Sequence, residues 1–193
     1  MFIQILYLIL PILLGGLCNM IFVKISWLNQ LKVPLDAGRN GADGKRIFGD
    51  NKTVKGFIGM PLFTALWFGV FHWLAHASPA AQALSLIPFH TFSALSALLY
   101  GGVWGLGYVL AELPNSWIKR RLDIAPGKNS NGPLRWLFIF FDQADSVIGC
   151  LIALHLFYTP PLDLALIIGA IAIGVHFAMN FLLYALGLKQ QYL

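Results

Sequence analysis

Charged residues are scarce in this sequence. Asp, Glu, Lys and Arg make up 11% of its 193 residues and hydrophobic residues make up 58%, whereas soluble domains carry about 25% charged residues. The mean hydropathy is +0.72. A soluble globular domain is therefore excluded, and the composition predicts an integral membrane protein.

Cysteine is also scarce, because Cys18 and Cys150 are the only two. Both lie in apolar stretches and their spacing fits no motif, so the sequence predicts neither a disulfide framework nor a thiol metal site. The first apolar stretch has no basic residue before it and no small-residue cleavage site. We therefore interpret it as a permanent membrane span and not as a signal peptide.

Five apolar stretches are long enough to cross a bilayer, which takes about 20 residues in a helix. They lie near residues 2–23, 56–76, 91–112, 136–157 and 164–186. Backbone groups have no water to bond within a bilayer, so these stretches should be helices. We expect an all-α, polytopic membrane protein with five transmembrane helices, forming a single domain over residues 1–193.

Lys and Arg are confined to one side of the predicted bundle. All 13 lie in loop 24–55, in loop 113–135 or after the fifth span, and five spans put these regions on one face. The positive-inside rule places that face in the cytoplasm and the N-terminus outside, so we expect a multi-pass cell-membrane protein. These cations could serve topology alone, but every acidic residue except Asp163 lies on or near the same face, and carboxylates contribute little to topology.

The first loop is rich in glycine and cations. It reads LDAGRNGADGKRIFGDNKTVKGFIG and ends where a predicted helix begins. Glycine lets backbone approach a ligand closely, and a helix N-terminus offers free N–H groups to an anion. The pattern is typical of a phosphate-binding loop, although the Walker A spacing does not fit it. A flexible, solvated loop is the alternative.

Two carboxylates, Asp142 and Asp145, lie about two turns into the fourth predicted span. Their spacing puts both on one face of a helix. Burying each costs about 2.5–3.5 kcal/mol on insertion scales, and a divalent cation between them would offset that cost. Mg²⁺ commonly binds one or two carboxylates together with phosphates and water. A structural pair bonded to Lys or Arg is the alternative.

The second charged region reads AELPNSWIKRRLDIAPG, and Glu112 ends the third predicted span. If Pro114 begins a short interfacial helix, Ser116 shares a face with Lys119 or Arg120. That face would present cations and a hydroxyl to an anion. The alternative is a basic rim whose side chains reach out to the interface.

Several blocks together resemble the CDP-archaeol synthase family and, more distantly, the CDP-diacylglycerol synthases. They are PLDAG at 34–38, DGKRIFGDNKTVKG at 43–56, ELPNSWIKRRL at 112–122, PG at 126–127 and DQADS at 142–146. The resemblance covers both charged loops and the start of the fourth span. It implies transfer of a cytidylyl group from CTP to a lipid phosphate, release of pyrophosphate, and Mg²⁺ as the cofactor.

The resemblance also implies roles for residues in these blocks. Asp142, Asp145 and Lys119 would be catalytic, and Asp142, Asp145 and Glu112 would be magnesium ligands. Substrate binding would fall to Ser116, Arg120, Arg46, Lys52, Thr53, Lys55 and Asp43. Which of these hold CTP and which hold the lipid phosphate is left open.

The chain departs from the more distant family at one point. That family carries PGHGG directly before its D-x-x-D element, whereas KNSNGPLRWLFIFF separates Gly127 from Asp142 here. We expect the corresponding turn at residues 128–131. The expected partners are CTP, the bilayer and a membrane lipid phosphate, either an archaeal-type ether lipid or phosphatidate. No nucleic acid is expected, and a homo-oligomer is one option for the assembly.

Other functions make different demands on the sequence. A cation- or proton-coupled transporter needs polar groups leading to both faces, but the outer half offers chiefly histidines such as His72 and His76. For these histidines, hydrogen bonding at the membrane interface is a simpler interpretation than zinc binding. A non-catalytic lipid-binding subunit does not explain Asp142 with Asp145. The CDP-alcohol phosphotransferase motif does not fit, because Lys45 and Arg46 follow Asp43-Gly44 and no D-x-x-x-D comes after.

Overall fold

The computed structural model describes residues 1–128, 132–185 and 187, and in this part of the chain five helices are long and apolar enough to cross a membrane. They are α1 (Phe2–Lys24), α2 (Val54–Ala77), α4 (Ala94–Arg121), α5 (Arg135–Leu154) and α6 (Leu162–Ala185). Short helices connect them: η1 (Asn29–Leu31), α3 (Pro79–Leu84), η2 (Phe89–Thr91) and η3 (Gly132–Leu134). The predicted all-α fold with five spans is confirmed.

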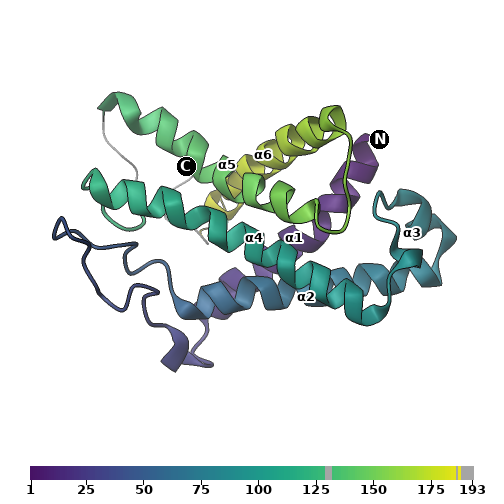
Figure 1. The fold of residues 1–193 in the computed structure, drawn as a ribbon, viewed down its shortest axis with the longest axis horizontal. Helices are drawn as coiled ribbons and strands as arrows, with labels where there is room; N and C mark the ends of the chain where they lie inside the picture. Colours follow the sequence, from purple (N-terminus) through teal and green to yellow (C-terminus); the bar gives the residue numbers. More distant parts are fainter. Residues whose placement is uncertain (129–131, 186, 188–193) are drawn as a thin grey trace.

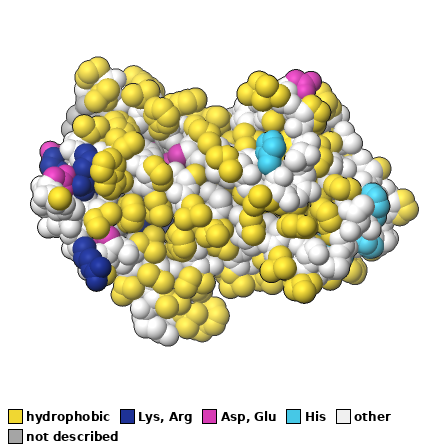
Figure 2. All heavy atoms as spheres, in the orientation of Figure 1, with side chains coloured by type: hydrophobic (Ala, Val, Ile, Leu, Met, Phe, Trp, Pro, Cys, Tyr) yellow, Lys and Arg dark blue, Asp and Glu magenta, His cyan; other side chains and the backbone are white. Residues whose placement is uncertain are grey.

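Both charged connections lie at the same end of the bundle, on the left in Figure 1. We call this end, formed by residues 25–53, 122–128 and 132–134 and the helix termini beside them, the loop end. The N-terminus lies at the opposite end. In Figure 2 the Lys and Arg side chains on the visible face gather at the loop end, and hydrophobic side chains cover most of the remaining surface. This is the surface expected of a membrane protein whose polar chemistry lies at one end.

Helix α4 is the centre of the bundle, because it packs against both α2 and α5. Small residues bring these helices close together, as is usual in membranes. A Cβ on Gly107 would lie 2.6 Å from the carbonyl oxygen of Gly149 on α5, and a Cβ on Gly105 would lie 2.8 Å from the carbonyl oxygen of Met60 on α2. The backbone of α4 is therefore held near both neighbours, which fixes the positions of its side chains at the loop end.

An aromatic cluster fills the half of the bundle away from the loop end. The ring of Phe68 lies 4.9 Å from that of Phe89, 5.9 Å from Trp104 and 5.4 Å from Phe157, in edge-to-face arrangements that aromatic pairs prefer. Nearby, His72 bonds to the carbonyl of Phe92 at 3.0 Å. The cluster fills this half of the bundle with apolar rings. This packing does not favour the polar path that a transporter would need.

The third span differs from its predicted extent. Helix α4 does not end at Glu112 but continues to Arg121, with Pro114 inside it. Pro114 therefore does not begin a separate interfacial helix, and that expectation was wrong. Membrane helices tolerate an internal proline where neighbouring groups satisfy the freed backbone. The consequence is that Ser116, Lys119 and Arg120 extend the same helix that carries Glu112.

Candidate active site at the loop end

Two facing helices bring the predicted aspartates together with two residues of α4. Asp142 and Asp145 lie three residues apart on α5, while Asn115 and Lys119 lie four residues apart on α4, so each pair shares a helix face. The amide nitrogen of Asn115 donates to Asp142 Oδ1 at 2.7 Å and to Asp145 Oδ2 at 2.8 Å. Lys119 Nζ lies 2.5 Å from Asp142 Oδ2.

The Asp142–Lys119 contact is the ion pair that the structural alternative predicts. Lys119 is 8% exposed, and its ammonium also lies 5.8 Å from the centre of the Phe138 ring. A buried ion pair gains little net stability, because desolvation of both charges offsets their attraction. The pair is therefore better explained by its position beside a second carboxylate than by a contribution to folding.

The two carboxylates also suit a divalent cation. An oxygen of Asp142 and an oxygen of Asp145 converge on one point, the amide nitrogen of Asn115. Mg²⁺ needs only one or two protein carboxylates when phosphates and water complete its six ligands. Among the described residues no three His, Cys, Asp or Glu side chains form a possible metal cage. The donor set therefore fits an ion shared with a phosphate ligand.

Glu112, the third predicted magnesium ligand, is engaged elsewhere. Its carboxylate pairs with the ammonium of Lys52 from the first loop. Both residues line a polar cavity of about 300 Å³ between α1, α2 and α4, to which Lys24 and Thr53 also contribute. The structure therefore does not gather the three predicted carboxylates into one group. Instead it joins Glu112 to the first loop.

Arg120 and Ser116 are buried on the helix that carries Lys119. Arg120 is 7% exposed, and its Nη1 has no hydrogen-bond partner, while its Nε lies 3.5 Å from the carbonyl oxygen of Ser116. Buried guanidinium donors normally bond to an acceptor. The unpaired Nη1 therefore identifies Arg120 as a candidate for binding an anionic group.

The first loop is organised by one buried carboxylate, Asp36, which is 5% exposed. It accepts hydrogen bonds from the backbone of Gly38, Phe48 and Gly49 at 2.9–3.0 Å and from Arg46 at 2.7 and 3.3 Å. Burial alone would raise the pKa of Asp36, but the Arg46 guanidinium and the three backbone donors hold it well below its ordinary value. Asp36 therefore remains ionised and fixes the path of residues 36–49.

Arg121, at the end of α4, ties this loop to the helix. Its guanidinium donates to Asp43 Oδ1 at 2.6 Å, to the carbonyl of Lys45 at 3.2 Å and to the carbonyl of Arg46. The Lys45 ammonium returns the contact by donating to the carbonyl of Arg121 at 2.9 Å. The loop is thus held beside Lys119 and Arg120, although its sequence lies more than 70 residues away. Asp43, predicted to bind substrate, is one of the groups that hold it.

The other predicted residues of this segment contact protein groups. Thr53 caps α2 by accepting from the backbone N–H of Gly56 at 3.2 Å, a cap typical of threonine. Arg46 bonds to Asp36 and, at 2.8 Å, to Asp50. Lys55 is fully buried, donates to the carbonyl of Ile25 at 2.8 Å and lies over the Phe22 ring. Its ammonium therefore faces the end of α1 and contacts neither aspartate.

Three residues that build the site were not among the site residues predicted from the sequence: Asn115, Asp36 and Arg121. The signal for Asn115 was its position one helical turn before Lys119. That spacing predicts a shared face, but the neighbours of that face depend on the continuation of α4 through Pro114. No local pattern distinguished Asp36 from the other loop acids, or Arg121 from its basic neighbours. The turn expected at residues 128–131 falls largely on residues 129–131, which lie outside the described residues.

Comparison with known proteins places these features in context. A family model described as CarS-like, CDP-archaeol synthase, matches residues 1–193. The CDP-archaeol synthase of Methanospirillum hungatei is 31% identical over 164 residues, which is 82% of this chain and 88% of its own. The CDP-archaeol synthase of Pyrococcus furiosus is 30% identical over 156 residues, or 81% of each chain.

A solved structure supports the fold independently. It is described as an intramembrane enzyme for archaeal membrane lipids biosynthesis, and it has a TM-score of 0.60 and 23% identity over 91% of both chains. The similarity shows that the two chains share a fold.

Proposed function

This chain belongs to the CDP-archaeol synthase family, and on that premise we propose that it transfers the cytidylyl group of CTP to the phosphate of a membrane lipid. An oxygen of the lipid phosphate forms a bond to the α-phosphorus of CTP. The bond from that phosphorus to the oxygen leading to the β-phosphate breaks, and pyrophosphate leaves. The product is a CDP-lipid for membrane lipid biosynthesis. The names of the relatives favour an archaeal ether lipid phosphate over phosphatidate as the acceptor.

The observation that carries the proposal is the meeting of Asp142, Asp145, Asn115 and Lys119 at the junction of α4 and α5. A lipid phosphate is already an anionic nucleophile near neutral pH, so no general base is needed. Such a reaction requires positioning and neutralisation of charge. A cation beside two carboxylates supplies both, since Lys119 attracts phosphates while the carboxylates attract a metal. Arg120, the next residue of the same helix, adds a buried guanidinium with an unpaired donor.

Magnesium is proposed as the cofactor, with Asp142 and Asp145 as its protein ligands. When bound, the ion would neutralise triphosphate oxygens and the charge that develops on the leaving pyrophosphate. Asn115 holds the two carboxylates in register before the metal binds, because its amide bonds to both. Lys119 and Arg120 hold phosphates, and Ser116 serves as a short-range donor. The ion pair of Glu112 with Lys52 leaves Glu112 outside this proposed metal site.

The active site is proposed to face the cytoplasm. The loop end carries nearly all the charged residues of the chain, and the positive-inside rule assigns such an end to the cytoplasm. CTP would then reach the site from the cytoplasm, while the hydrocarbon chains of the acceptor stay in the bilayer.

A product assay tests the reaction. Purified protein in detergent is incubated with CTP, Mg²⁺ and either phosphatidate or an isoprenoid ether lipid phosphate, and the CDP-lipid is measured. We expect product from at least one acceptor, and we expect Asp145→Asn or chelation of Mg²⁺ to abolish it. The matched control is Asp163→Asn, which changes an exposed acid at the opposite end of the bundle and should keep full activity.

Each result has a distinct meaning. Product with only one acceptor identifies the lipid class. Activity that survives in Asp145→Asn would refute the metal assignment while leaving the reaction intact. If neither acceptor gives product with the wild-type protein, the proposed reaction is wrong for these lipids, and ion transport becomes the next hypothesis to measure.

A further inference from the structure

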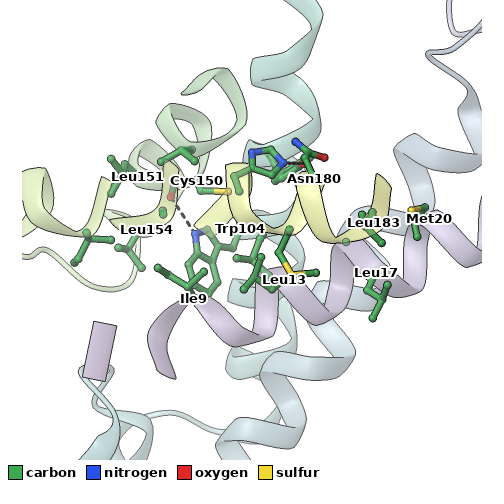
Figure 3. A pocket seen from close by; sticks show the side chains of 18 residues that line it. Ile9, Leu13, Leu17, Met20, Trp104, Cys150, Leu151, Leu154, Asn180 and Leu183 are labelled. Carbon is green, nitrogen blue, oxygen red and sulfur yellow. Dashed lines mark hydrogen bonds between the residues drawn. The ribbon is translucent and has the colours of Figure 1, made fainter. Parts of the chain in front are cut away.

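An apolar groove runs through the membrane part of the molecule between α1, α4, α5 and α6. Its volume is about 230 Å³. Figure 3 shows α1 side chains from Ile9 to Met20 along one wall, Asn180 and Leu183 of α6 along another, and Trp104 beside Cys150 between them. Trp104 is held there by a hydrogen bond to the Cys150 carbonyl at 3.0 Å. The groove is therefore lined by fixed, almost wholly apolar side chains.

The groove lies along the helices and not across them. The α1 residues that line it follow one helical stripe: Ile9, Ile12, Leu13, Gly16, Leu17 and Met20. This stripe extends over about 16 Å at the rise of an α-helix. On α6 the lining extends from Ile168 to Leu183, about 22 Å at the same rise. Two parallel stripes of this length, oriented along the bundle, match a hydrocarbon chain that lies along the membrane normal.

The end of the groove nearest the loops meets the polar cavity that contains Lys52 and Glu112. Gly16, Met20 and Tyr108 line both spaces. A ligand that fills them would have a long apolar part within the bundle and a head beside the cations of the polar cavity, Lys24 and Lys52. Two ammonium groups against the one carboxylate of Glu112 leave the cavity with a net positive charge, which favours an amphiphile with an anionic head.

We propose that the groove between α1 and α6 holds one hydrocarbon chain of the lipid phosphate acceptor, and that the polar cavity beside Lys52 holds its phosphate. This inference rests on the proposed function and places the phosphates of its two substrates next to each other along one face of α4, because Glu112 of the polar cavity lies one helical turn before Asn115, which bonds to both aspartates. The first loop, through Lys52 and Thr53, then serves the lipid phosphate. Lys119, Arg120 and the aspartates serve the nucleotide.

Gly16 offers a direct way to close the passage between the two spaces. A Cβ at this position would lie 3.8 Å from the Met60 side chain, an ordinary contact, so a side chain can begin there without a shift of the backbone. Gly16→Leu should block the junction. The matched control is Gly174→Leu, because Gly174 is exposed on α6 and a Cβ there has no neighbour within 4 Å.

The test is photo-crosslinking without CTP, so it does not depend on turnover. The probe is a dialkylglycerol phosphate with a diazirine midway along one chain, and the crosslinked peptides are mapped by mass spectrometry. We expect crosslinks on α1 residues 9–20 and α6 residues 168–183, competed by unlabelled dialkylglycerol phosphate but not by inorganic phosphate. Gly16→Leu should lose them and Gly174→Leu should keep them. Leu13→Trp, a second variant within the groove, should lose them as well.

Other crosslinking patterns would overturn the proposal. Equal labelling in all variants, or labelling of bilayer-facing positions such as Leu10 and Leu166, would show that the probe only dissolves in the surrounding lipid. Competition by neutral dialkylglycerol as strong as by its phosphate would mean that the polar cavity does not select the head group, and a structural membrane lipid would then be the occupant.

Kinetics separate this proposal from the proposed function. In Gly16→Leu the KM for the lipid should rise about tenfold or more while the KM for CTP stays unchanged, because one methylene in an apolar site is worth roughly ten- to two-hundredfold. Specific crosslinking with no CDP-lipid formation would keep the groove assignment and refute the reaction. Turnover with unchanged lipid KM in Gly16→Leu would keep the reaction and refute the groove.

Discussion

Replacement of Asp36 by asparagine should loosen the whole first loop, because the geometry around this carboxylate leaves no orientation that suits an amide. Oδ1 accepts from the backbone of Gly38 and from Arg46 Nη2, while Oδ2 accepts from the backbone of Phe48 and Gly49 and from Arg46 Nε. Asparagine keeps one acceptor oxygen and turns an NH₂ toward the other set. At least two donors then lose their acceptor and face a donor instead.

The free-energy cost of Asp36→Asn follows from the number of buried donors that lose their acceptor. Each buried donor without an acceptor costs about 1–3 kcal/mol, so the better of the two orientations costs about 2–6 kcal/mol for two such donors. A loss of about 2 kcal/mol corresponds to about a 30-fold larger opening constant. Asp50→Asn provides the matched control, since Asp50 also pairs with Arg46 but its side chain is 71% exposed, and an exposed pair is worth at most about 1 kcal/mol.

Hydrogen exchange measures the effect at amides that do not bond to Asp36 themselves. The N–H groups of Leu35 and Gly41 bond to the carbonyls of Lys52 and Lys45, both at 2.8 Å. Their exchange should accelerate about 30-fold or more in Asp36→Asn and much less in Asp50→Asn. Equal exchange in the two variants would refute the idea that Asp36 organises the loop, because both remove a carboxylate from Arg46.

The same carboxylate predicts a pH dependence. The pKa of Asp36 is held below its ordinary value, so the unfolded loop takes up a proton before the folded loop does. Its contribution to stability is therefore fully present above the ordinary carboxyl pKa of about 3.9 and is lost as the pH falls below it. The wild-type loop should lose protection in this acidic range. Asp36→Asn should show no corresponding slope.

Three further changes test the remaining framework. Arg121→Lys should raise the KM for the lipid phosphate and make residues 25–53 more sensitive to protease, because an ammonium cannot replace the guanidinium contacts to Asp43 and the loop carbonyls. Arg39→Lys at an exposed loop position should change neither. Gly107→Val should lower the free energy of unfolding of the detergent-solubilised protein by about 1–3 kcal/mol, because the larger side chain overpacks against Gly149. An unchanged free energy of unfolding would contradict the close approach of α4 and α5. Lys119→Met should lower kcat/KM for CTP about ten- to a hundredfold, the worth of a charge-assisted bond, while Lys55→Met should leave the KM for CTP unchanged.

The five spans and the position of the aspartate pair could be predicted from the sequence, because they depend on hydropathy, length and residue spacing within single helices. Hydropathy and length located five spans, since the thickness of a bilayer sets both. The depth and spacing of Asp142 and Asp145 placed them on one helix face inside the protein, because a charged side chain cannot face lipid cheaply. The role of Lys119 in binding a phosphate stays a prediction, and the structure places its ammonium beside Asp142. Each of these inferences needed only helix geometry and the cost of burying charge.

The remaining features depend on contacts between distant segments. Asp36 was one acid among several until the path of the loop brought three backbone N–H groups to it. Arg121 could not be separated from Arg120, because which of them faces the first loop depends on the continuation of α4 through Pro114. Lys55 looked like its neighbour Lys52, yet helix position directs it into the α1 contact. Local patterns identify which residues carry charge, whereas tertiary packing decides which charges meet.

Pairing of charges at the loop end explains how one small site could take two anionic substrates. Lys119 is paired with Asp142, and Lys52 with Glu112. Breaking a buried ion pair is costly when one half is left alone. A nucleotide triphosphate that arrives with its divalent cation offers a partner to both halves at once, since phosphate oxygens can bond to Lys119 while the cation attracts Asp142. CTP without a metal ion offers a partner to Lys119 but none to Asp142. The geometry therefore favours metal-bound CTP as the form that this site accepts.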